Sequence, residues 1–295
     1  ILLIIPTVIS IKNLKDNIDE KKNQISFLEK NLSNKKSQLA NIHTKLLEKN
    51  INLENVLFED GISFENFSNI NVKINETNYI LSEFKSDDIV FAKHPSASSS
   101  AYIEIYDKKL FLVTATGQIV YSNIDVFDKE DFLLTPIKSN IQDLIRYREF
   151  YKSSAFGVKD FLIYKNNIFI SYIKKHSKDC FSTSVLKAEL NFEYIIFEDF
   201  YVPKKCIKKD EEFYNASKHD KFVPHQSGGR LIAYNNNLVF TTGDYRYRIL
   251  AQDLASDFGK LISINLLSNE KKIISLGHRN PQGLFYHANL NYLFS

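Results

Sequence analysis

The first 60 residues repeat their apolar positions every seven residues. One apolar residue stands at each of seven consecutive positions of this repeat: Ile11, Ile18, Ile25, Leu32, Leu39, Leu46 and Leu53. Such a repeat keeps one apolar stripe on one face of a supercoiled helix. No Gly or Pro interrupts residues 11–60. The pattern predicts a coiled-coil stalk over residues 11–57 that self-associates, and the alternative is a single amphipathic helix packed against its own domain.

Residues 1–10, ILLIIPTVIS, are mostly apolar and precede this stalk. A bilayer-spanning helix needs about 20 apolar residues, so these ten alone do not span a membrane. The chain contains no Met and does not begin with one, and we therefore expect it to be a fragment. We expect residues 1–10 to be the remnant of a signal anchor or transmembrane segment. The alternative is a buried helix or strand.

From residue 96 onward, apolar positions alternate with polar ones and short polar turns separate the runs. One unit recurs, in which a Tyr, a short polar turn and an apolar strand follow one another, at Tyr106, Tyr164, Tyr234 and more loosely Tyr286. Each copy predicts a β-hairpin. The Tyr spacings of 58, 70 and 52 residues fit propeller blades with loop insertions, and unrelated hairpins of a sandwich are the alternative. Residues 58–95 show neither pattern, which indicates a linker or a small irregular region.

Composition and charge narrow the classes of partner. The chain is 44% hydrophobic and 25% charged, which is typical of a globular protein. Residues 11–57 hold nine Lys and six acidic residues, which accounts for the whole net charge of +3. The remaining residues are therefore balanced in charge, and we expect no nucleic-acid partner.

Three blocks near the C-terminal end carry candidate chemistry. They are HQSGGRL at 225–231 followed by TTGD at 241–244, AQDL at 251–254 followed by GK at 259–260, and GHRNPQGL at 277–284. In order and spacing they resemble motifs of the soluble PQQ-dependent sugar dehydrogenases, the glucose/sorbosone dehydrogenase family. The clear resemblance covers residues 222–294, and a weaker one begins near residue 101. It implies a mostly β fold, a partial six-bladed β-propeller with about four blades in residues 96–295, truncated at the C-terminus and preceded by the long N-terminal helix.

The resemblance also implies roles for four residues. His225 falls on the catalytic base, and His suits proton transfer near neutral pH. Arg279 and Asn280 fall on cofactor-binding positions, where a guanidinium suits the anionic oxygens of a tricarboxylate. Asp244 falls on an acid at the substrate side. The structural alternatives are a turn His capping the Gly228–Gly229 bend, a surface ion pair for Arg279 and an Asx turn for Asp244.

Two departures from the family pattern bear on the cofactor. Lys152 stands where the family has a cofactor-side Gln; it can still pair with a carboxylate, but the two are not equivalent. The family's calcium ligands are expected beyond residue 295, so the fragment alone is not expected to bind calcium or to turn over. Four glycines of the motifs are predicted to serve backbone geometry rather than ligand contact: Gly243, Gly259, Gly277 and Gly283.

The two cysteines, Cys180 and Cys206, lie 26 residues apart. With an anchor remnant upstream, they indicate a disulfide formed in the periplasm, and two free thiols are the alternative.

Together these features predict a protein of the bacterial cell envelope, anchored in the membrane by its N-terminus and facing the periplasm. Its reaction would be oxidation of a sugar hydroxyl, with PQQ as hydride acceptor and calcium as activating metal. A non-catalytic propeller that binds glycans or proteins on a coiled-coil stalk is the competing hypothesis. The residues at 225, 279 and 280 favour the enzyme, whereas Lys152 and the stalk favour the binding module.

Overall fold

The computed structural model describes residues 18, 21–22, 24–28, 61–86, 88, 101–145, 156–209 and 222–295. The chain divides into two units, Ile1–Asn55 and Val56–Ser295. In the first unit the described residues are helical and exposed, the stripe residues Ile18 and Ile25 among them. The rest of the predicted stalk and the predicted anchor lie outside the described residues. Within the described residues, no helix is both long enough and apolar enough to cross a membrane.

The described residues of the second unit are mostly β-structure with three short helical segments. The helical segments are η1 (Ile124–Asp128), α2 (Ile141–Leu144) and α4 (Arg248–Gln252). The strands are β1 (Ile62–Ile74), β2 (Thr77–Lys85), β3 (Ala101–Tyr106), β4 (Lys109–Thr114), β5 (Ile119–Asn123), β6 (Asp131–Ser139), β7 (Val158–Tyr164), β8 (Asn167–Ser177), β9 (Cys180–Glu189), β10 (Tyr194–Ile195), β11 (Glu198–Tyr201), β12 (Ile207–Lys208), β13 (Gly228–Tyr234), β14 (Asn237–Thr242), β15 (Lys260–Asn265), β16 (Lys271–Leu276), β17 (Phe285–His287) and β18 (Tyr292–Phe294).

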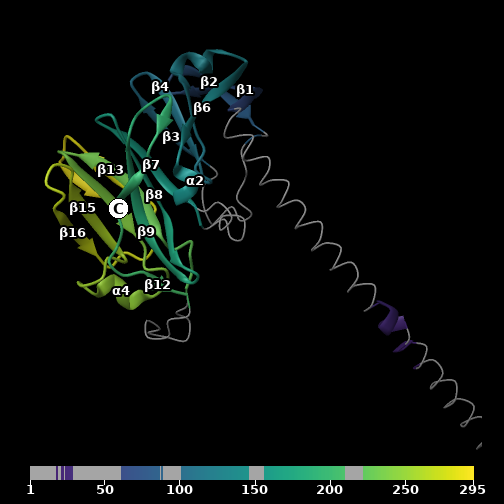
Figure 1. Ribbon diagram of the computed structural model, residues 1–295. Helices are drawn as coiled ribbons and strands as arrows, with labels where there is room; N and C mark the ends of the chain where they lie inside the picture. Colours follow the sequence, from purple (N-terminus) through teal and green to yellow (C-terminus); the bar gives the residue numbers. More distant parts are fainter. Residues whose placement is uncertain are drawn as a thin grey trace, which may run out of the picture. The chain divides into compact units, whose positions relative to one another are not determined.

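These strands form three large sheets and a final hairpin. The first sheet has the order β2-β1-β6-β5-β4-β3 with β10 beside β6, and the second has β11-β9-β8-β7 with β12 beside β9. The third has β13-β14-β15-β16, and β17 pairs with β18. One edge strand of each sheet lies beside an edge strand of the next, β3 next to β7, β7 next to β13 and β13 next to β17. The sheets follow one another as propeller blades do, and Figure 1 shows β3, β7 and β13 near one another.

The recurring Tyr unit is the hairpin β3–β4, β7–β8, β13–β14 or β17–β18. Three of these hairpins turn through two residues that both have positive φ: Asp107–Lys108, Lys165–Asn166 and Asn235–Asn236. That geometry is the type I′ turn, whose twist matches the twist of the flanking strands and which Asn and Asp tolerate best. The fourth hairpin, β17–β18, has a longer loop. The hairpin prediction is confirmed at all four places.

The core lies between neighbouring sheets. One buried cluster joins the first sheet to the second, and its members include Phe111, Val113, Ile137, Phe161, Ile168 and Ile170. Another joins the second to the third, with Phe169, Val185, Leu238, Phe240 and Ile262. A third lies beneath the loops at one end, with Ile173, Phe181, Tyr245, Tyr247 and Phe258. Packing face to face fixes each sheet against the next, and it thereby fixes the loops that the sheets carry.

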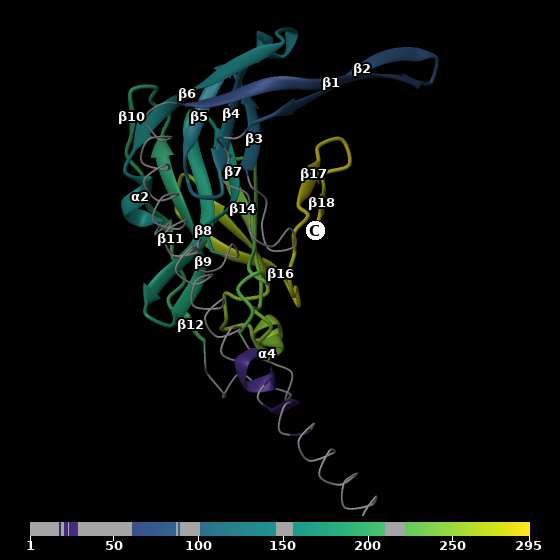
Figure 2. The ribbon, with the colours of Figure 1, turned by 90° about the vertical axis from the view of Figure 1, so that its right-hand side faces the viewer.

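Residues 62–85, which the sequence pattern indicates to be part of a linker, form two regular strands. β1 pairs with β6 only at its start, where Ile62 is fully buried against Leu134. Beyond that start, β1 and β2 pair with each other and extend past the rest of the sheet (Figure 2). Most positions of β2 are exposed. Only the base of this hairpin contacts a core, although apolar and polar residues alternate along Ile70–Ile74.

The part of the chain described from residue 101 onward thus holds three sheets and the first hairpin of a further one. The sequence pattern predicts about four blades over the same range. The mostly β, propeller-like fold is confirmed. Closure into six blades stays a prediction.

Candidate active site

The sequence motifs meet at one end of the sheets. The HQSGGRL block leads into β13, the TTGD block ends β14, and the GHRNPQG block leads into β17. Because β13 and β14 are antiparallel, the start of one and the end of the other lie at the same edge. β17 lies beside β13, so its preceding loop reaches this edge as well. Three loops therefore converge here.

Backbone hydrogen bonds join the first two loops around His225. The Gly243 N–H donates to the Ser227 carbonyl at 2.7 Å, and the Tyr245 N–H donates to the Gln226 carbonyl at 2.9 Å. The Val223 N–H donates to the Tyr245 carbonyl at 2.9 Å. Tyr245 thus pairs with residues on both sides of His225. The loop that carries the predicted base is therefore held by the loop that follows β14.

The GHRNPQG loop is bonded to both of the others. The Asp244 N–H donates to the Arg279 carbonyl at 2.9 Å, and the Gly228 N–H donates to Asn280 Oδ1 at 3.3 Å. Thr241 Oγ1 donates to the Pro281 carbonyl at 2.9 Å. These bonds bring the loops of His225, Asp244, Arg279 and Asn280 together. The predicted residue Lys152 lies outside the described residues.

His225 is exposed, and its ring makes no hydrogen bond within the described residues. The Gly228 N–H is bound by Asn280 and the Gly229 N–H by Thr241 Oγ1, at 3.0 Å, so His225 does not cap this bend. Partial burial and then the nearby cations Lys159 and Arg246 lower the pKa of His225 from its ordinary value. A lowered pKa keeps the imidazole neutral, which is the form that accepts a proton.

Arg279 is exposed, and its guanidinium forms no ion pair within the described residues. The alternative of a surface ion pair is therefore not seen in this part of the chain. Asn280 is half-buried, and its side-chain oxygen is bound to the Gly228 N–H. Asn280 therefore positions the bend after His225, whatever else its amide nitrogen contacts.

Asp244 is fully buried. Its Oδ1 accepts the Arg246 N–H at 2.7 Å, two residues along the chain, which is an Asx turn. The structural alternative named for this residue is thus present. Its predicted role toward the substrate stays a prediction.

Gln226, next to His225, is a site residue that motif reading alone does not single out. Its Oε1 is buried and receives no hydrogen bond from any residue that the structure describes. A buried acceptor without a donor is costly, and an incoming ligand with a hydroxyl or N–H group would satisfy it. No sequence pattern predicts that Gln226 Oε1 is buried without a donor, because this depends on how the loop folds.

Lys159 occupies a β-bulge beneath the same bend. The register of β7 against β8 shifts between Val158 and Asp160, which leaves Lys159 as an extra residue. Bulges redirect side chains next to functional sites. Lys159 is only 7% exposed, and burial lowers its pKa to about 7. The signal in the sequence is a pair of charges, Lys159 and Asp160, at the start of an otherwise apolar strand.

The neighbouring charges lie on the edge strands β3, β7 and β13. Asp160 Oδ1 pairs with Arg230 at 3.3 Å, and Oδ2 accepts the Leu231 N–H at 2.8 Å, which ties β7 to β13. Burial, opposed by Arg230, raises the pKa of Asp160 to about 6. On β3, burial and the charge of Asp160 raise the pKa of Glu104 to about 7. Four ionisable groups thus meet on adjacent strands below the loops.

Lys260, in the GK of the second block, has a structural task. It is fully buried, and its ammonium donates to the carbonyls of Leu250, Ala251 and Phe258 at 2.7, 2.9 and 2.7 Å. Two of these carbonyls belong to α4, so Lys260 satisfies groups that the helix end leaves unpaired. Burial lowers its pKa. This block therefore fixes the segment after Asp244.

Three of the four motif glycines are required by the backbone, as predicted. A Cβ on Gly243 would lie 2.1 Å from the Gln226 carbonyl oxygen, and one on Gly259, where φ is +68°, 2.5 Å from Ala251 Cβ. Gly277 has φ of +88°. Gly283 has no atom within 4 Å of such a Cβ, and no positive φ, so the prediction is wrong for this residue.

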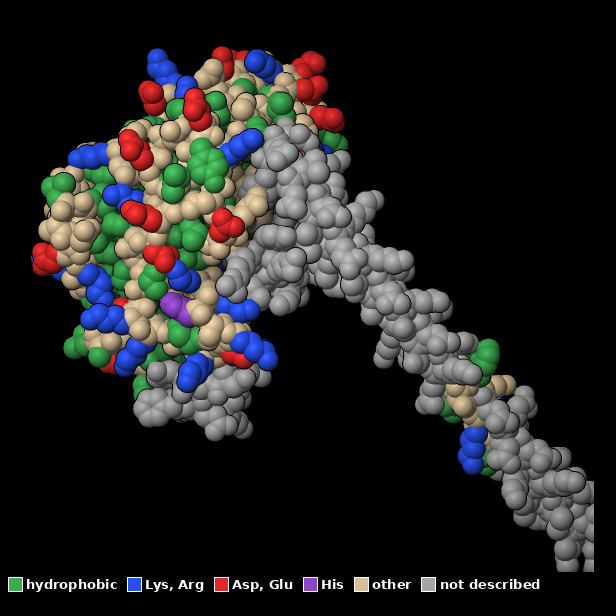
Figure 3. Space-filling view, in the orientation of Figure 1, with side chains coloured by type: hydrophobic (Ala, Val, Ile, Leu, Met, Phe, Trp, Pro, Cys, Tyr) green, Lys and Arg blue, Asp and Glu red, His purple; other side chains and the backbone are tan. Residues whose placement is uncertain are grey.

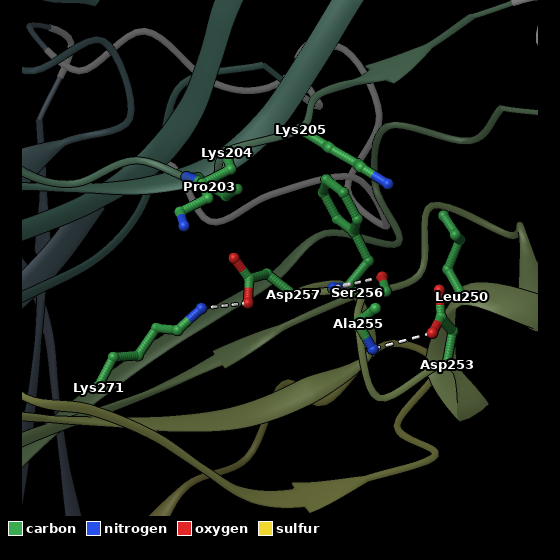
Figure 4. A pocket seen from close by; sticks show the side chains of 10 residues that line it. Pro203, Lys204, Lys205, Leu250, Asp253, Ala255, Ser256, Asp257 and Lys271 are labelled. Carbon is green, nitrogen blue, oxygen red and sulfur yellow. Dashed lines mark hydrogen bonds and ion pairs between the residues drawn. The ribbon is translucent and has the colours of Figure 1, made fainter.

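A separate cavity of about 340 Å³ lies between the loop at Pro203–Lys205 and the segment that follows α4. Figure 4 shows its acidic side chains already bonded: Lys271 pairs with Asp257 at 2.5 Å, and Asp253 accepts the Ala255 N–H at 2.9 Å. None of the predicted site residues lines it. The candidate active site is therefore the set of converging loops, not this cavity.

Two further observations concern metal and cysteine chemistry. Within the described residues, no group of three or more His, Cys, Asp or Glu side chains could hold a metal ion. Calcium ligands beyond residue 295 stay a prediction. Cys180 and Cys206 form a disulfide that links the start of β9 to the loop before β12.

A comparison with family models decides the classification. Residues 150–295 match the model described as Glucose / Sorbosone dehydrogenase. This part of the chain is therefore similar to that family. The resemblance carried by the motifs is thus confirmed, and the glucose/sorbosone dehydrogenase segment includes all three converging loops. No curated protein matches the chain.

Several solved structures are similar to about two thirds of the chain. A glucose dehydrogenase is 15% identical over 67% of this chain and 61% of its own length, with a TM-score of 0.46. The soluble aldose sugar dehydrogenase of Escherichia coli, in its apo form, is 16% identical over 69% of this chain and 58% of its own, with a TM-score of 0.46. An oxidoreductase (glucose dehydrogenase) of Thermus thermophilus is 17% identical over 66% and 57%, with a TM-score of 0.44. The chain thus spans 57–61% of the length of these three.

Proposed function

We propose that the chain oxidises a sugar hydroxyl by hydride transfer to PQQ. The observation that supports this most is the hydrogen-bonded assembly of three loops of a glucose/sorbosone dehydrogenase segment. The assembly presents the imidazole of His225 and the guanidinium of Arg279 with no partner inside the described protein. Side chains held on a rigid frame and left unbonded are suited to act on a ligand.

His225 acts as the base. When the carbinol carbon loses hydride, the hydroxyl proton must leave to an acceptor, and a neutral imidazole nitrogen can take it. The lowered pKa of His225 keeps that nitrogen unprotonated at neutral pH. The buried Oε1 of Gln226, next in the chain, can accept a hydrogen bond from a second sugar hydroxyl. These two groups together orient the carbinol.

The charges at the site fit an anionic quinone. PQQ carries three carboxylates, and when bound it supplies the carbonyl that receives the hydride. Arg279 offers a guanidinium without an ion pair in the described protein, and guanidinium pairs with carboxylates through two parallel hydrogen bonds. The charge of Lys159 also affects this site, because it lowers the pKa of His225. Arg279, with Asn280 and Lys152 as predicted, would hold the cofactor.

We further propose that the protein works in the periplasm of a bacterial envelope, anchored by residues 1–10 and self-associating through residues 11–57. The Cys180–Cys206 disulfide supports an oxidising compartment. The other support is the sequence pattern of the N-terminal unit.

The test is reconstitution of the complete natural protein with PQQ and calcium, followed by dye reduction with a panel of aldoses. We expect sugar-dependent reduction and quinone absorbance that survives desalting. Absence of both would overturn the proposed function. If the protein instead retains no PQQ but binds glycans on an array, the competing hypothesis of a non-catalytic module is correct, and Lys152 in place of Gln would then mark the loss of the cofactor.

A further inference from the structure

The residues that follow Asp244 have an unusual backbone conformation. Tyr245 and Arg246 have φ of +52° and +73°, and neither is Gly or Asn. They do not form the two-residue turn of a hairpin, unlike the other adjacent non-glycine pairs with positive φ in the described chain. A bulky residue in this region costs about 1–3 kcal/mol, and such residues persist only where their surroundings fix them. This conformation therefore indicates that the surroundings hold the turn, and with it the side chains of Tyr245 and Arg246, in a fixed position.

Tyr245 is the anchor of this turn. Its ring is fully buried, stacked on Phe222 with centroids 5.4 Å apart and edge-on to Phe258 at 6.0 Å. Its hydroxyl is hydrogen-bonded to Thr183 Oγ1 at 2.8 Å. Its backbone pairs with Gln226 and Val223. These contacts fix the turn, and they thereby fix the backbone position from which the Arg246 side chain extends.

Arg246 follows Tyr245, whose N–H is bonded to the carbonyl of Gln226, the residue after His225. Its N–H is held by Asp244 Oδ1, and its charge is one of the two that lower the pKa of His225. It is half-buried, and its guanidinium forms no ion pair or hydrogen bond within the described residues. Lys and Arg side chains also gather at the end of the molecule where β12 and α4 lie (Figure 3). A half-buried cation that no described residue neutralises is suited to an anionic ligand.

We propose that Arg246 binds a carboxylate on the sugar, so that the substrate class is acidic sugars such as uronates. The inference rests on the proposed function, because it takes His225 as the base that faces the reacting carbinol. A group beside the base lies beside the substrate. The guanidinium fork matches the two oxygens of a carboxylate, and it discriminates against a neutral sugar that leaves it unpaired.

The test compares D-glucuronate with D-glucuronamide, which has the same ring and no charge. In the reconstituted protein we expect kcat/KM for glucuronate to exceed that for glucuronamide by roughly 10- to 100-fold, the value of a hydrogen bond to a charged group. Arg246→Gln should bring the ratio close to one, mainly by raising KM for glucuronate. Arg248→Gln, the same change at an exposed residue two positions on, should leave the ratio as it is.

A binding measurement separates failure of this inference from failure of the proposed function. Titration of the protein without cofactor, followed by the His225 ring resonances in NMR spectra, should show tighter binding of glucuronate than of glucuronamide and loss of that difference in Arg246→Gln. If no sugar is oxidised but this difference holds, the inference stands and the proposed reaction is wrong. Equal binding of the two sugars by the unaltered protein overturns the inference.

Arg246 could instead serve a carboxylate of the cofactor, and one outcome distinguishes the two. Loss of PQQ retention in Arg246→Gln, with the sugar ratio unchanged, overturns the inference in favour of the cofactor. Should Arg246→Gln fail to fold, Arg246→Lys keeps the charge without the fork. Its ratio should then lie between one and the ratio of the unaltered protein, and a ratio equal to that of the unaltered protein counts against a bidentate carboxylate contact.

Discussion

Lys159, Asp160 and Glu104 are charged residues held in places that favour their neutral forms. Burial is the largest cause at each, with the charge of Asp160 adding to the effect at Glu104, and the resulting pKa values are about 7, about 6 and about 7. The stability of the folded chain must therefore depend on pH through these groups. Lys159 gives the clearest case, because its window lies above the range in which the carboxyl groups titrate.

Replacing Lys159 with Met should change how stability depends on alkaline pH. The pKa of Lys159 is about 7 when folded and 10.5 by its ordinary value, so between these values the unfolded chain binds more protons. Its contribution to the free energy of unfolding therefore rises as the pH increases from about 7 toward 10, and Lys159→Met should lose that rise. Urea unfolding at pH 7 and pH 9 measures it, with Lys178→Met as exposed control. Equal pH slopes in all three proteins would contradict the burial of Lys159.

The state of His225 predicts the pH profile of activity. Because burial and two nearby cations lower its pKa, the acid limb of kcat/KM should lie below the pH at which an ordinary His titrates. Arg246→Gln removes one of those cations, so the limb should move to higher pH. A pH series of kcat/KM on an uncharged aldose checks this. A limb that stays in place would show that Arg246 does not act on His225.

At the scale of elements, paired bulges place the charged groups beneath the loops. The register of β13 against β14 shifts between Gly228 and Leu231, at the same end as the Lys159 bulge of β7. Thr241 Oγ1 accepts the N–H groups of both Gly229 and Arg230, at 3.0 and 2.9 Å. The adjacent edge strands β7 and β13 are thus irregular at one end only. This irregular end is the end that carries the site.

The contact between the bulges gives a test by glycine substitution. A Cβ on Gly229, where φ is +110°, would lie 2.4 Å from Lys159 Cβ. We expect Gly229→Ala to lower the free energy of unfolding by at least about 2 kcal/mol, from backbone strain and overpacking together. Gly283→Ala is the matched control, because no atom lies within 4 Å of its Cβ. Similar effects of the two substitutions in chemical denaturation would contradict this packing of the two bulges.

Lys260 tests the role of the second block. Replacing it with Met removes the donor from three buried carbonyls and should destabilise the chain by about 3 kcal/mol. Because α4 follows Asp244 closely, the loss should also loosen the loop of Asp244. Hydrogen exchange of the Tyr245 amide, measured with the unfolding transition, reports on both. Unchanged protection of that amide would separate Lys260 from the site.

At the scale of the whole molecule, local features were predictable and long-range ones were not. The hairpins could be predicted because a two-residue turn and its flanking strands are encoded within about ten residues. The β1–β2 hairpin was not predicted, although apolar and polar residues alternate along Ile70–Ile74. His225, Arg279 and Asn280 could be placed through contiguous motifs. The roles of Gln226, Lys159 and Arg246 depend on which strands and loops meet, and no local pattern records that.

The disulfide acts at this scale because it closes a long loop. Cys180 and Cys206 are separated by 26 residues, for which loop-closure entropy predicts a stabilisation of about 3–4 kcal/mol. Thermal unfolding with and without a reductant should show a clear decrease in Tm. The double variant Cys180→Ser with Cys206→Ser is the control and should not respond to the reductant. No decrease in the unaltered protein would mean that the bond contributes little.

The most direct test of the central claim is rapid anaerobic mixing of the PQQ- and calcium-reconstituted protein with sugar, while the absorbance of the bound quinone is followed. We predict that the quinone is reduced in a single turnover, and that His225→Ala slows this reduction by a factor on the order of 10²–10⁴ with PQQ retention unchanged. A quinone that is retained but not reduced by any sugar would contradict the claim. So would reduction at the same rate with and without His225.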